Sequence, residues 1–437
     1  MDIASTNENN YIGAAAILEK KKKYIIPCLG HFYSDPRQMV RGEMQYLYDS
    51  EGRKYLDCFA GVSVINCGHC NPAINAAVTE QLNTLQHVCN IYLTENFVNL
   101  AEQLARITPG RLQKTFFCST GTEANEGAAL LAEIATGSSE FIALRGGLHG
   151  RTKLTMSLTG LSMWRTDPNP VGGIHFARNP YCYRCPMKLS PEACGLACAS
   201  EVEETIKSAT TGRPAAFIAE SIQGNAGIIV PPKGYFRRVK EILDHYGALF
   251  IADEVQTGFA RTGKMFAIEH FGVTPDIMTM AKALGNGAPI SAFIATPEIA
   301  DKYTRPGAST LGGNPVSTTA GLQVIRYIEE HDLMGNAERR GVQLRAGLKE
   351  IQKRHPIIGD IRGLGLMVGA EFVHADKSPA AAELDLVLEE LKNRGFIVGK
   401  NGIERNVMAF QPPLIITEKN INDVLNAVEL VLTEKGF

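Results

Sequence analysis

The stretch "FIADEVQTGFARTGK" at residues 250–264 places two acids, Asp253 and Glu254, at the end of a strongly apolar run. Such a run predicts a buried strand of a parallel sheet, with Asp253 at its carboxyl end. Open α/β sheets bind ligands in the crevice outside those strand ends, so Asp253 is a candidate site residue. It could instead bond to a loop amide, cap the next helix, or bind a metal together with Glu254. Adjacent strand residues point to opposite faces, which disfavours the metal.

The alternation of apolar runs with amphipathic stretches continues over most of the chain. Strands are predicted at 114–119, 140–145, 215–221, 248–254 and 290–296, and helices at 123–136 and 234–247. This pattern predicts an α/β fold with a parallel sheet and helices on both of its faces.

The same pattern suggests two domains of unequal size. We assign 65–320 to a large domain and 321–437 to a smaller α+β domain, which holds a strand-like stretch at 365–373. Residues 1–64 include a hairpin-like stretch at 46–61, and we expect this segment to pack with the smaller domain.

The composition is that of an ordinary globular protein, with 437 residues, 45% of them hydrophobic and 21% charged. The net charge of -2 provides no basic field for nucleic acid. No apolar run approaches the roughly 18 residues of a membrane span. The first ten residues, "MDIASTNENN", lack the blocks of a secretory signal, which predicts a cytoplasmic location. The charge run "EKKKKY" at 19–24 is interpreted as a solvated helix face.

A second stretch, "IMTMAKALGNGAP" at 277–289, sets Lys282 among small and apolar residues. Burial disfavours the ammonium ion and lowers its pKa, so a purely structural role would be costly. Lysines in such settings are often nucleophilic amines that form Schiff bases with carbonyl compounds. Lys282 is therefore a candidate catalytic residue.

A third stretch, "STGTEANEGA" at 119–128, runs from a predicted strand end into a helix. Free backbone N–H groups at a helix N-terminus, with hydroxyls beside them, bind phosphate well. The alternative is that Ser119 or Thr122 only caps the helix. An acid such as Asp253 can pair with a pyridinium nitrogen. Together, a phosphate site, this acid and a carbonyl-binding lysine specify pyridoxal phosphate.

The chain resembles the class III aminotransferases of fold type I over nearly its whole length, because "FIADEVQTGFARTGK" followed by "DIMTMAKALGNGAP" is similar to that family's signature block. The resemblance implies a fold type I pyridoxal-phosphate transferase, with a mostly parallel seven-stranded sheet flanked by helices in the large domain. The smaller α+β domain would come from both chain ends. Within the family, the sequence looks most like the alanine-glyoxylate and β-amino acid-pyruvate subgroup.

The resemblance also implies roles for single residues. Lys282 matches the Schiff-base lysine, Asp253 the partner of the pyridinium nitrogen, and Gln256 the residue that contacts the ring hydroxyl. The other cofactor-binding residues that it implies are Ser119, Gly121, Thr122, Leu148, His149 and Val255. Thr310, in "STLGGNP", would reach the phosphate of the neighbouring subunit, which implies a homodimer or a dimer of dimers with shared active sites.

For the substrate, the resemblance implies Arg362, in "IRGLGLM", as the ligand of a carboxylate, and Tyr33 as a second contact. A surface ion pair is the alternative for Arg362. The chain departs from the family pattern at Leu148, where an aromatic residue usually stacks on the cofactor ring. It departs again at Asn225, where several members carry a glutamate that pairs with the arginine. We therefore expect Arg362 to stay unpaired and open to substrate.

The predicted function is a transaminase that works in two half-reactions. It would move an amino group from an amino acid or ω-amino compound to a small oxo acid, with pyruvate or glyoxylate favoured over 2-oxoglutarate. A pyridoxal-phosphate lyase, epimerase or mutase on the same scaffold is the rival reading. A non-catalytic binding or regulatory protein is disfavoured, because Lys282, Asp253 and Gln256 are all present.

Four of the ten cysteines fall in "CYRCPMKLSPEACGLAC" and form a C-x2-C-x8-C-x3-C pattern, at Cys182, Cys185, Cys194 and Cys198. Such spacing can hold zinc. The alternatives are reduced thiols in an inserted loop, which we favour, or a disulfide pair. No metal is assigned to the site.

Overall fold

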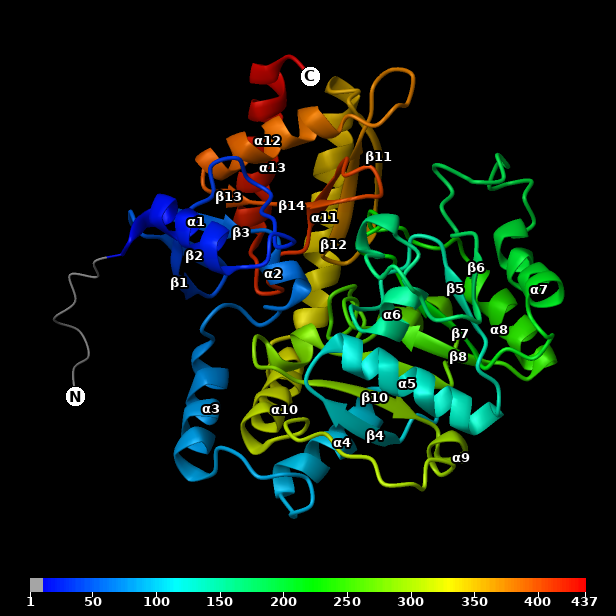
Figure 1. Cartoon of the computed structure of the whole chain (residues 1–437). Coiled ribbons are helices and arrows are strands. Elements are labelled where there is room, and N and C mark those ends of the chain that lie inside the picture. The colour runs from blue at the N-terminus through cyan, green and yellow to red at the C-terminus, as the bar shows by residue number, and fades with distance from the viewer. Residues whose placement is uncertain (1–10) are drawn as a thin grey trace.

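The computed structural model describes residues 11–437, and its centre is a seven-stranded sheet in the order β4-β10-β9-β8-β7-β5-β6 (Figure 1). The strands are β4 (Lys114–Cys118), β5 (Phe141–Leu144), β6 (Ile174–Ala177), β7 (Ala216–Glu220), β8 (Leu249–Asp253), β9 (Ile277–Met280) and β10 (Ser291–Ala295). The strands from β9 to β6 pair in parallel, whereas β10 is antiparallel to both of its neighbours. The predicted mostly parallel sheet of seven strands is confirmed.

Helices cover both faces of this sheet, because its central strands are buried at every position and therefore on both sides. In β7, Phe217 and Ala219 belong to one hydrophobic cluster, and Ala216 and Ile218 belong to another on the opposite face. The helices of this region are α3 (Pro72–Thr84), α4 (Glu95–Ile107), α5 (Gly121–Thr136), α6 (Lys153–Leu158), α7 (Ala197–Ala209), α8 (Tyr235–Tyr246), α9 (Pro297–Ala300) and α10 (Pro315–Glu330). The short 3₁₀ helices are η1 (Ser162–Trp164), η2 (Ala267–Phe271) and η3 (Lys282–Gly285).

Two strands of the sheet were not predicted. β9 lies inside the stretch that was read for its lysine, and its four buried residues give no alternation to distinguish a strand from a helix. β6, "IHFA", contains a histidine and pairs only with β5 at the edge of the sheet. Both strands are held by pairing with neighbours distant in sequence.

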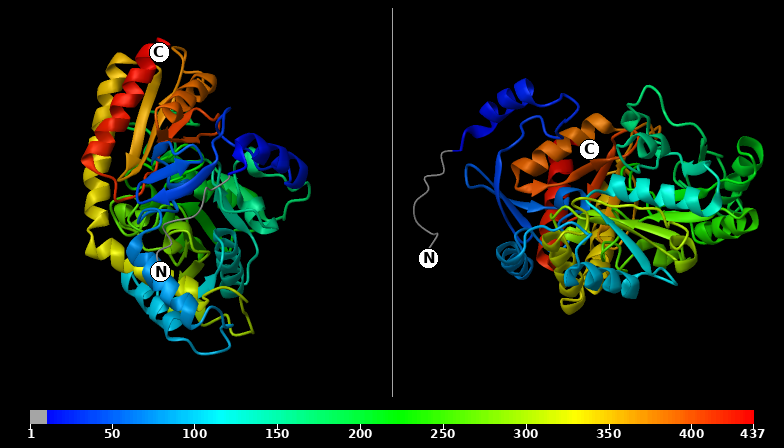
Figure 2. Two further views of the ribbon diagram at one scale, coloured as in Figure 1. Left: turned by 90° about the vertical axis from the view of Figure 1, so that its left-hand side faces the viewer. Right: turned by 60° about the horizontal axis from the view of Figure 1, so that its bottom comes forward.

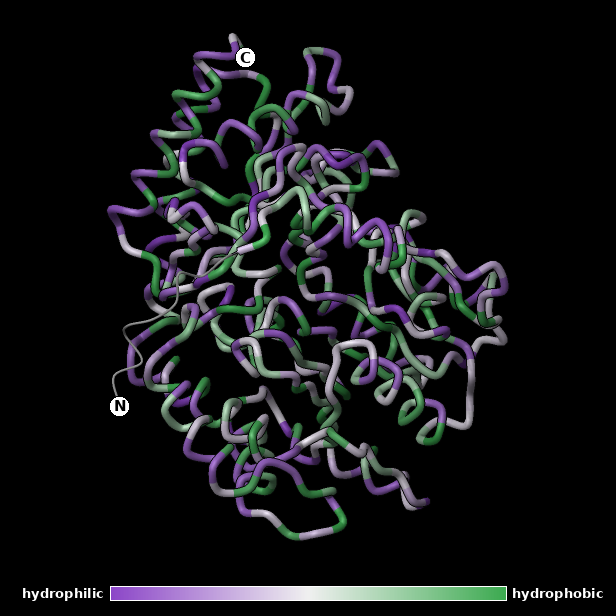
Figure 3. The backbone as a smooth tube through the Cα atoms, turned by 60° about the vertical axis from the view of Figure 1, so that its left-hand side comes forward, coloured by the Kyte–Doolittle hydropathy of each residue, from purple (hydrophilic) through white to green (hydrophobic). Residues whose placement is uncertain are grey.

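The C-terminal part forms an antiparallel sheet in the order β11-β12-β15-β14, packed with long helices. Its elements are α11 (Leu333–Arg354), β11 (Ile358–Leu364), β12 (Met367–Phe372), α12 (Ala381–Asn393), β14 (Gly399–Asn401), β15 (Val407–Phe410) and α13 (Glu418–Lys435). Hydrophobic and hydrophilic residues alternate along these helices, as the tube of Figure 3 shows, so that each presents one apolar face inward.

The N-terminal segment lies against the C-terminal elements (Figure 1). It contains α1 (Gly13–Tyr24), β1 (Met39–Glu43), β2 (Tyr46–Asp49), β3 (Lys54–Asp57) and the short α2 (Ala60–Ser63). β2 and β3 form the expected hairpin, and β13 (Phe396–Ile397) pairs in parallel with β3. The two ends of the chain therefore share one sheet.

Helix α1 lies at the edge of the molecule (Figure 2). It has no buried residue, and its last turn carries three lysines of the run "EKKKKY", which agrees with the predicted solvated face. Within residues 11–437 no helix combines the length and the apolarity needed to cross a membrane. The first ten residues, on which the predicted location rests, lie outside the described part.

Candidate active site

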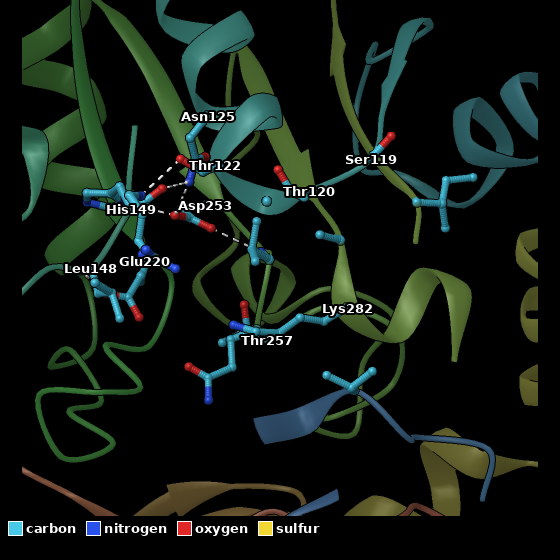
Figure 4. Close-up of a pocket in the computed structure, with 18 of the residues that line it drawn as sticks. Ser119, Thr120, Thr122, Asn125, Leu148, His149, Glu220, Asp253, Thr257 and Lys282 are labelled. Atoms are coloured by element: carbon cyan, nitrogen blue, oxygen red, sulfur yellow. Dashed lines mark hydrogen bonds and ion pairs between the residues drawn. The ribbon is translucent and has the colours of Figure 1, made fainter. Parts of the chain in front are cut away.

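A cavity of about 510 Å³ opens at the carboxyl ends of β7 and β8. Its walls come from the turn between β4 and α5, the loop 148–151, the two strand ends, and the segment 281–290 (Figure 4). Nine predicted site residues line it: Ser119, Gly121, Thr122, Leu148, His149, Asp253, Val255, Gln256 and Lys282. The fold brings these residues to one place from segments far apart in the sequence.

Lys282 follows β9 and opens the 3₁₀ helix η3. Its backbone has φ 47°, a left-handed conformation that non-glycine residues adopt mainly where the surroundings impose it. Within residues 11–437 its amino group has no hydrogen bond or ion pair, and burial lowers its pKa, although the charges of Asp253 and Glu220 oppose that shift. A half-buried, unpaired amine with a lowered pKa is suited to act as a nucleophile and a base.

Asp253 is fixed by three donors at the end of β8. Its Oδ1 accepts the N–H of Val255 at 3.0 Å, and its Oδ2 accepts from Nδ2 of Asn125 at 2.8 Å. Nδ1 of His149 lies 2.8 Å from the same Oδ2. Asn125 also donates to the carbonyl of His149 at 2.7 Å and accepts from the hydroxyl of Thr279 at 2.6 Å. The carboxylate is therefore immobile, and these contacts argue against a metal ligand.

A second carboxyl, Glu220, lies beside Asp253, because β7 and β8 pair in parallel with these two residues in register. It accepts the N–H groups of Leu148 and Gly224, both at 2.8 Å. Burial raises the pKa of Glu220 to about 7, with the charge of His149 opposing and that of Asp253 adding to the rise. This group can therefore hold or release a proton near neutral pH beside the cavity.

The predicted phosphate site lies at the N-terminus of α5. Thr120 caps the helix, rather than Ser119 or Thr122: its hydroxyl accepts the N–H of Glu123, and the Glu123 carboxylate accepts the N–H groups of Ser119 and Thr120. Among the described residues, the N–H groups of Gly121 and Thr122 find no acceptor. These donors remain available to an anion.

The loop that carries His149 is tied to the same helix. The hydroxyl of Thr122 accepts the N–H groups of Arg151 and Thr152 at 3.0 and 3.1 Å. Gln256 is held by a bond from its Nε2 to Oε1 of Gln411 at 3.0 Å. Leu148 lines the cavity and packs against Leu161, Ala226 and Ile229, so the wall is aliphatic at this position.

The expectation that Arg362 stays unpaired is wrong. Its Nη1 bonds to Asp360 at 2.7 Å and to Glu371 at 2.8 Å, and its Nε donates to the carbonyl of Gly227 at 2.9 Å. The β11–β12 hairpin sets Asp360 opposite Glu371, which puts both acids beside the arginine. Arg362 does not line the cavity, and Asn225 instead accepts from the indole of Trp164 at 3.0 Å. A substitution at position 225 therefore does not decide whether Arg362 is neutralised.

Two other predicted residues lie apart from the cavity. The hydroxyl of Tyr33 donates to the carbonyl of Val398 at 3.0 Å and so ties the N-terminal segment to the C-terminal part. Thr310 is exposed and lines a separate outer cavity of about 630 Å³. Ser119 lines both cavities, so the two adjoin.

The cavity residues that were not predicted include Asn125, Arg151, Trp164 and Glu220. Asn125 lies one turn inside "STGTEANEGA", and Arg151 lies two residues after His149, so both fell within quoted motifs. Arg151 is exposed, and its guanidinium has no hydrogen bond or ion pair within residues 11–437. Trp164 has no local pattern that points to a cavity.

The four cysteines of the insert are free thiols, and the described residues contain no group of three or more His, Cys, Asp or Glu side chains placed to hold a metal. The alternative of a zinc site therefore has no support in the geometry.

The cavity suits pyridoxal phosphate by its unpaired groups. They are the amine of Lys282, the N–H groups at the start of α5, and the buried Nε2 of His149, which has no partner among the described residues. An amine, an anion site and a fixed carboxylate match the aldehyde, phosphate and pyridine nitrogen of this cofactor in kind. The residues present fit the group.

Comparison with known proteins identifies the family of this chain. The family model described as aminotransferase class-III matches residues 33–432. The chain is 42% identical over 429 residues to "Alanine--glyoxylate aminotransferase 2 homolog 2, mitochondrial" of Arabidopsis thaliana, which covers 97% of this chain and 89% of that protein. It is 37% identical over 424 residues to the "Leucine/methionine racemase" of Thermococcus litoralis, covering 96% and 95%.

Among solved structures, a Bacillus anthracis aminotransferase matches with a TM-score of 0.89 and 30% identity, covering 96% of this chain and 98% of that one. The family match runs from residue 33 to residue 432 and so includes the seven-stranded sheet, the cavity and the C-terminal sheet, which means that the likeness is not confined to one motif. This chain belongs to the class-III aminotransferases.

Proposed function

We propose that this protein is a pyridoxal-phosphate-dependent transaminase that moves an amino group from an amino acid or ω-amino compound to a small oxo acid. The observation that carries the proposal is the unpaired, half-buried Lys282 in the same cavity as the fixed carboxylate of Asp253. Family membership supports the same reaction class.

The proposed roles follow from the contacts of each residue. When bound, pyridoxal phosphate supplies an aldehyde that takes up the amino group and a ring that accepts the electrons of a substrate C–H bond. The amine of Lys282 would take the proton from that carbon and pass it to the cofactor, because its lowered pKa leaves more of it neutral. Asp253, held by Asn125 and Val255, keeps a proton on the ring nitrogen. The start of α5 binds the phosphate.

Arg151 is the residue we propose to bind the substrate carboxylate. Arg362 is occupied by two acids, whereas Arg151 lines the cavity with a guanidinium that has no partner among the described residues. It is also the single arginine in the described cavity wall. One guanidinium binds one carboxylate in bidentate fashion, so pyruvate or glyoxylate should be preferred to the dicarboxylate 2-oxoglutarate.

The test compares kcat/KM for pyruvate, glyoxylate and 2-oxoglutarate with one shared donor. Loss of a charge-assisted contact costs about 1.5 to 3 kcal/mol, so Arg151→Ala should lower kcat/KM for pyruvate by roughly tenfold or more. Arg151→Lys, the matched control, keeps the charge and should recover part of the loss. Asn225→Glu should leave the order of the three acceptors unchanged. Wild-type preference for 2-oxoglutarate would contradict the proposed acceptor.

We also propose an assembly and a location for the protein. Thr310 is exposed at the cavity that adjoins Ser119, which supports a homodimer, or a dimer of dimers, in which this threonine completes the partner's phosphate site. A cytoplasmic location rests on residues 1–10 alone, and the Arabidopsis relative carries "mitochondrial" in its name.

Racemisation is the second candidate, because the leucine/methionine racemase of Thermococcus litoralis is 37% identical over nearly the whole chain. A racemase removes the α-proton and returns it to the opposite face of the same carbon, whose C–N bond stays intact, whereas a transaminase passes the amino group to an oxo acid. A ¹⁵N-labelled L-amino acid incubated with an unlabelled oxo acid therefore separates the two reactions. Appearance of the D-enantiomer without a new amino acid would favour the racemase.

A further inference from the structure

The four cysteines at positions 182, 185, 194 and 198 surround one small cavity, about 20 Å³ in volume, on the insert between β6 and α7. The cavity is smaller than the roughly 30 Å³ that a water molecule occupies in the liquid, and Cys182 lies near enough to Cys194 and Cys185 for their charges to raise its pKa. All four are free thiols in the structure. We call this group the thiol cluster.

One side of the thiol cluster belongs to a segment docked on the C-terminal sheet. Next to Cys182, the hydroxyl of Tyr181 bonds to the carboxylate of Glu371, which is 2% exposed. Arg184 bonds to the same carboxylate and donates to the carbonyl of Lys377 at 2.9 Å. Residues 181–184, which we call the docked segment, therefore fasten the insert to β12.

The other side of the thiol cluster lies at the start of α7, a helix that packs on the large sheet. Cys194 and Cys198 flank the start of α7, which packs against β6 and α8 through buried residues such as Val202 and Ile206. A covalent bond between the two sides would tie the segment that grips the C-terminal sheet to a helix of the large domain.

We propose that Cys182 and Cys194 form a reversible disulfide that locks the docked segment to α7 under oxidising conditions. Cys182 is the exposed member of the thiol cluster, so an oxidant reaches it first. The thiolate of Cys182 attacks a small-molecule disulfide such as oxidised glutathione and releases one glutathione thiol. The thiolate of Cys194 then displaces the second glutathione, so two cysteine thiols lose two electrons and two protons, and the oxidant is reduced to two thiols.

The environment of the thiols agrees with slow, conditional closure. Burial, and then the neighbouring Cys194 and Cys185, raise the pKa of Cys182. Burial also raises the pKa of Cys198 to about 11. Because the thiolate is the attacking species, the rate of closure should rise about tenfold per pH unit between neutral pH and the thiol pKa.

Hydrogen bonds connect the docked segment to the wall of the active-site cavity. The carboxylate of Glu371, which accepts hydrogen bonds from Tyr181 and Arg184, also accepts one from Arg362. Arg362 in turn donates to the carbonyl of Gly227 in the loop after β7. That loop begins next to Glu220, a residue of the active-site cavity. Closing the disulfide should therefore restrict motion between the two sheets near the cavity.

The test uses trypsin, because the exposed Lys188 lies between Cys182 and Cys194 in the sequence. The holoenzyme is treated with oxidised glutathione, nicked at Lys188, and run on gels with and without reductant. With the disulfide closed, the two halves should migrate together without reductant and separate with it. Peptide mass mapping should find Cys182 joined to Cys194, and the apparent melting temperature should rise by several degrees.

Matched variants distinguish the lock from general oxidation. Cys182→Ser and Cys194→Ser should abolish both the linked halves and the rise in melting temperature, whereas Cys28→Ser, at an exposed cysteine outside the thiol cluster, should keep both. Halves that separate without reductant, or glutathione attached singly to each thiol, would overturn the proposal. So would one equivalent of zinc held by the thiol cluster and removed by a chelator with loss of stability.

Discussion

Replacing Asp253 by asparagine tests the electronic role proposed for this residue, because the side chain keeps its size and loses its charge. In the wild-type protein Oδ1 accepts one N–H, from Val255, while Oδ2 faces two groups, Asn125 and His149. An asparagine amide offers one acceptor and one NH₂ group. Whichever way it turns, the NH₂ group meets at least one of these former donors.

Two magnitudes follow from these contacts. A buried donor left unpaired costs about 1 to 3 kcal/mol, so Asp253→Asn should fold with stability reduced by about that amount. Removal of one preorganised charged or polar group from an active site costs about 10²- to 10³-fold in rate. The loss should fall on the proton transfer at the substrate carbon, because the neutral amide cannot hold the ring nitrogen in its protonated form.

The assay is the donor half-reaction under single-turnover conditions, followed by the absorbance change of the bound cofactor. Glu254→Gln is the matched control: the neighbouring acid is fully buried, does not line the cavity, and bonds to Ser221, Thr257 and the N–H groups of Ala267 and Ile268. It should lower stability but leave the rate per folded, cofactor-loaded enzyme near that of the wild type. A rate in Asp253→Asn within about threefold of the wild type would refute the electronic role.

Three further predictions use other parts of the site. Lys282→Ala should fold, bind the cofactor without a covalent link, and show no turnover; near-normal activity would contradict the central assignment. Thr310→Ala, and dilution of the wild type to monomers, should each weaken cofactor retention measured by equilibrium dialysis, and a monomer with full affinity would argue against shared sites. Burial raises the pKa of Glu220 from 4.5 to about 7, so its contribution to the free energy of unfolding is greatest below pH 4.5 and is lost as the pH rises through 7. Glu220→Gln should lessen that fall in stability. An equal pH dependence of the free energy of unfolding in the wild type and in Glu220→Gln would contradict this prediction.

The sequence predicted the parts of the site that depend on local pattern. Asp253 and the start of α5 follow apolar runs, and the sheet topology then brings strand ends together in a known way. Lys282 stood out because its charge is unusual among small apolar neighbours. These inferences needed no knowledge of which distant residues touch.

The residues that were missed depend on such distant contacts. Asn125 acts through a carboxylate 128 positions further along the chain. Glu220 gains its raised pKa from burial and from the register of β7 against β8. Arg151 is distinguished only by lacking the partners that surface arginines usually find, and that can be recognised only once the fold is known.

The error about Arg362 has a physical cause that applies beyond this residue. From the sequence, Arg362 was expected to face the neutral Asn225 and to stay unpaired, but a buried guanidinium is costly wherever its counter-ion is absent. The β11–β12 hairpin already meets this requirement, since its antiparallel register places Asp360 opposite Glu371 beside the arginine. Burial raises the pKa of Glu371, but the charge of Arg362 and three hydrogen bonds outweigh it, so the pKa ends below its ordinary value and the acid stays ionised. A charge that is neutralised within its own hairpin has no need of a substrate carboxylate, and this is why the unpaired Arg151 is the better candidate for substrate recognition.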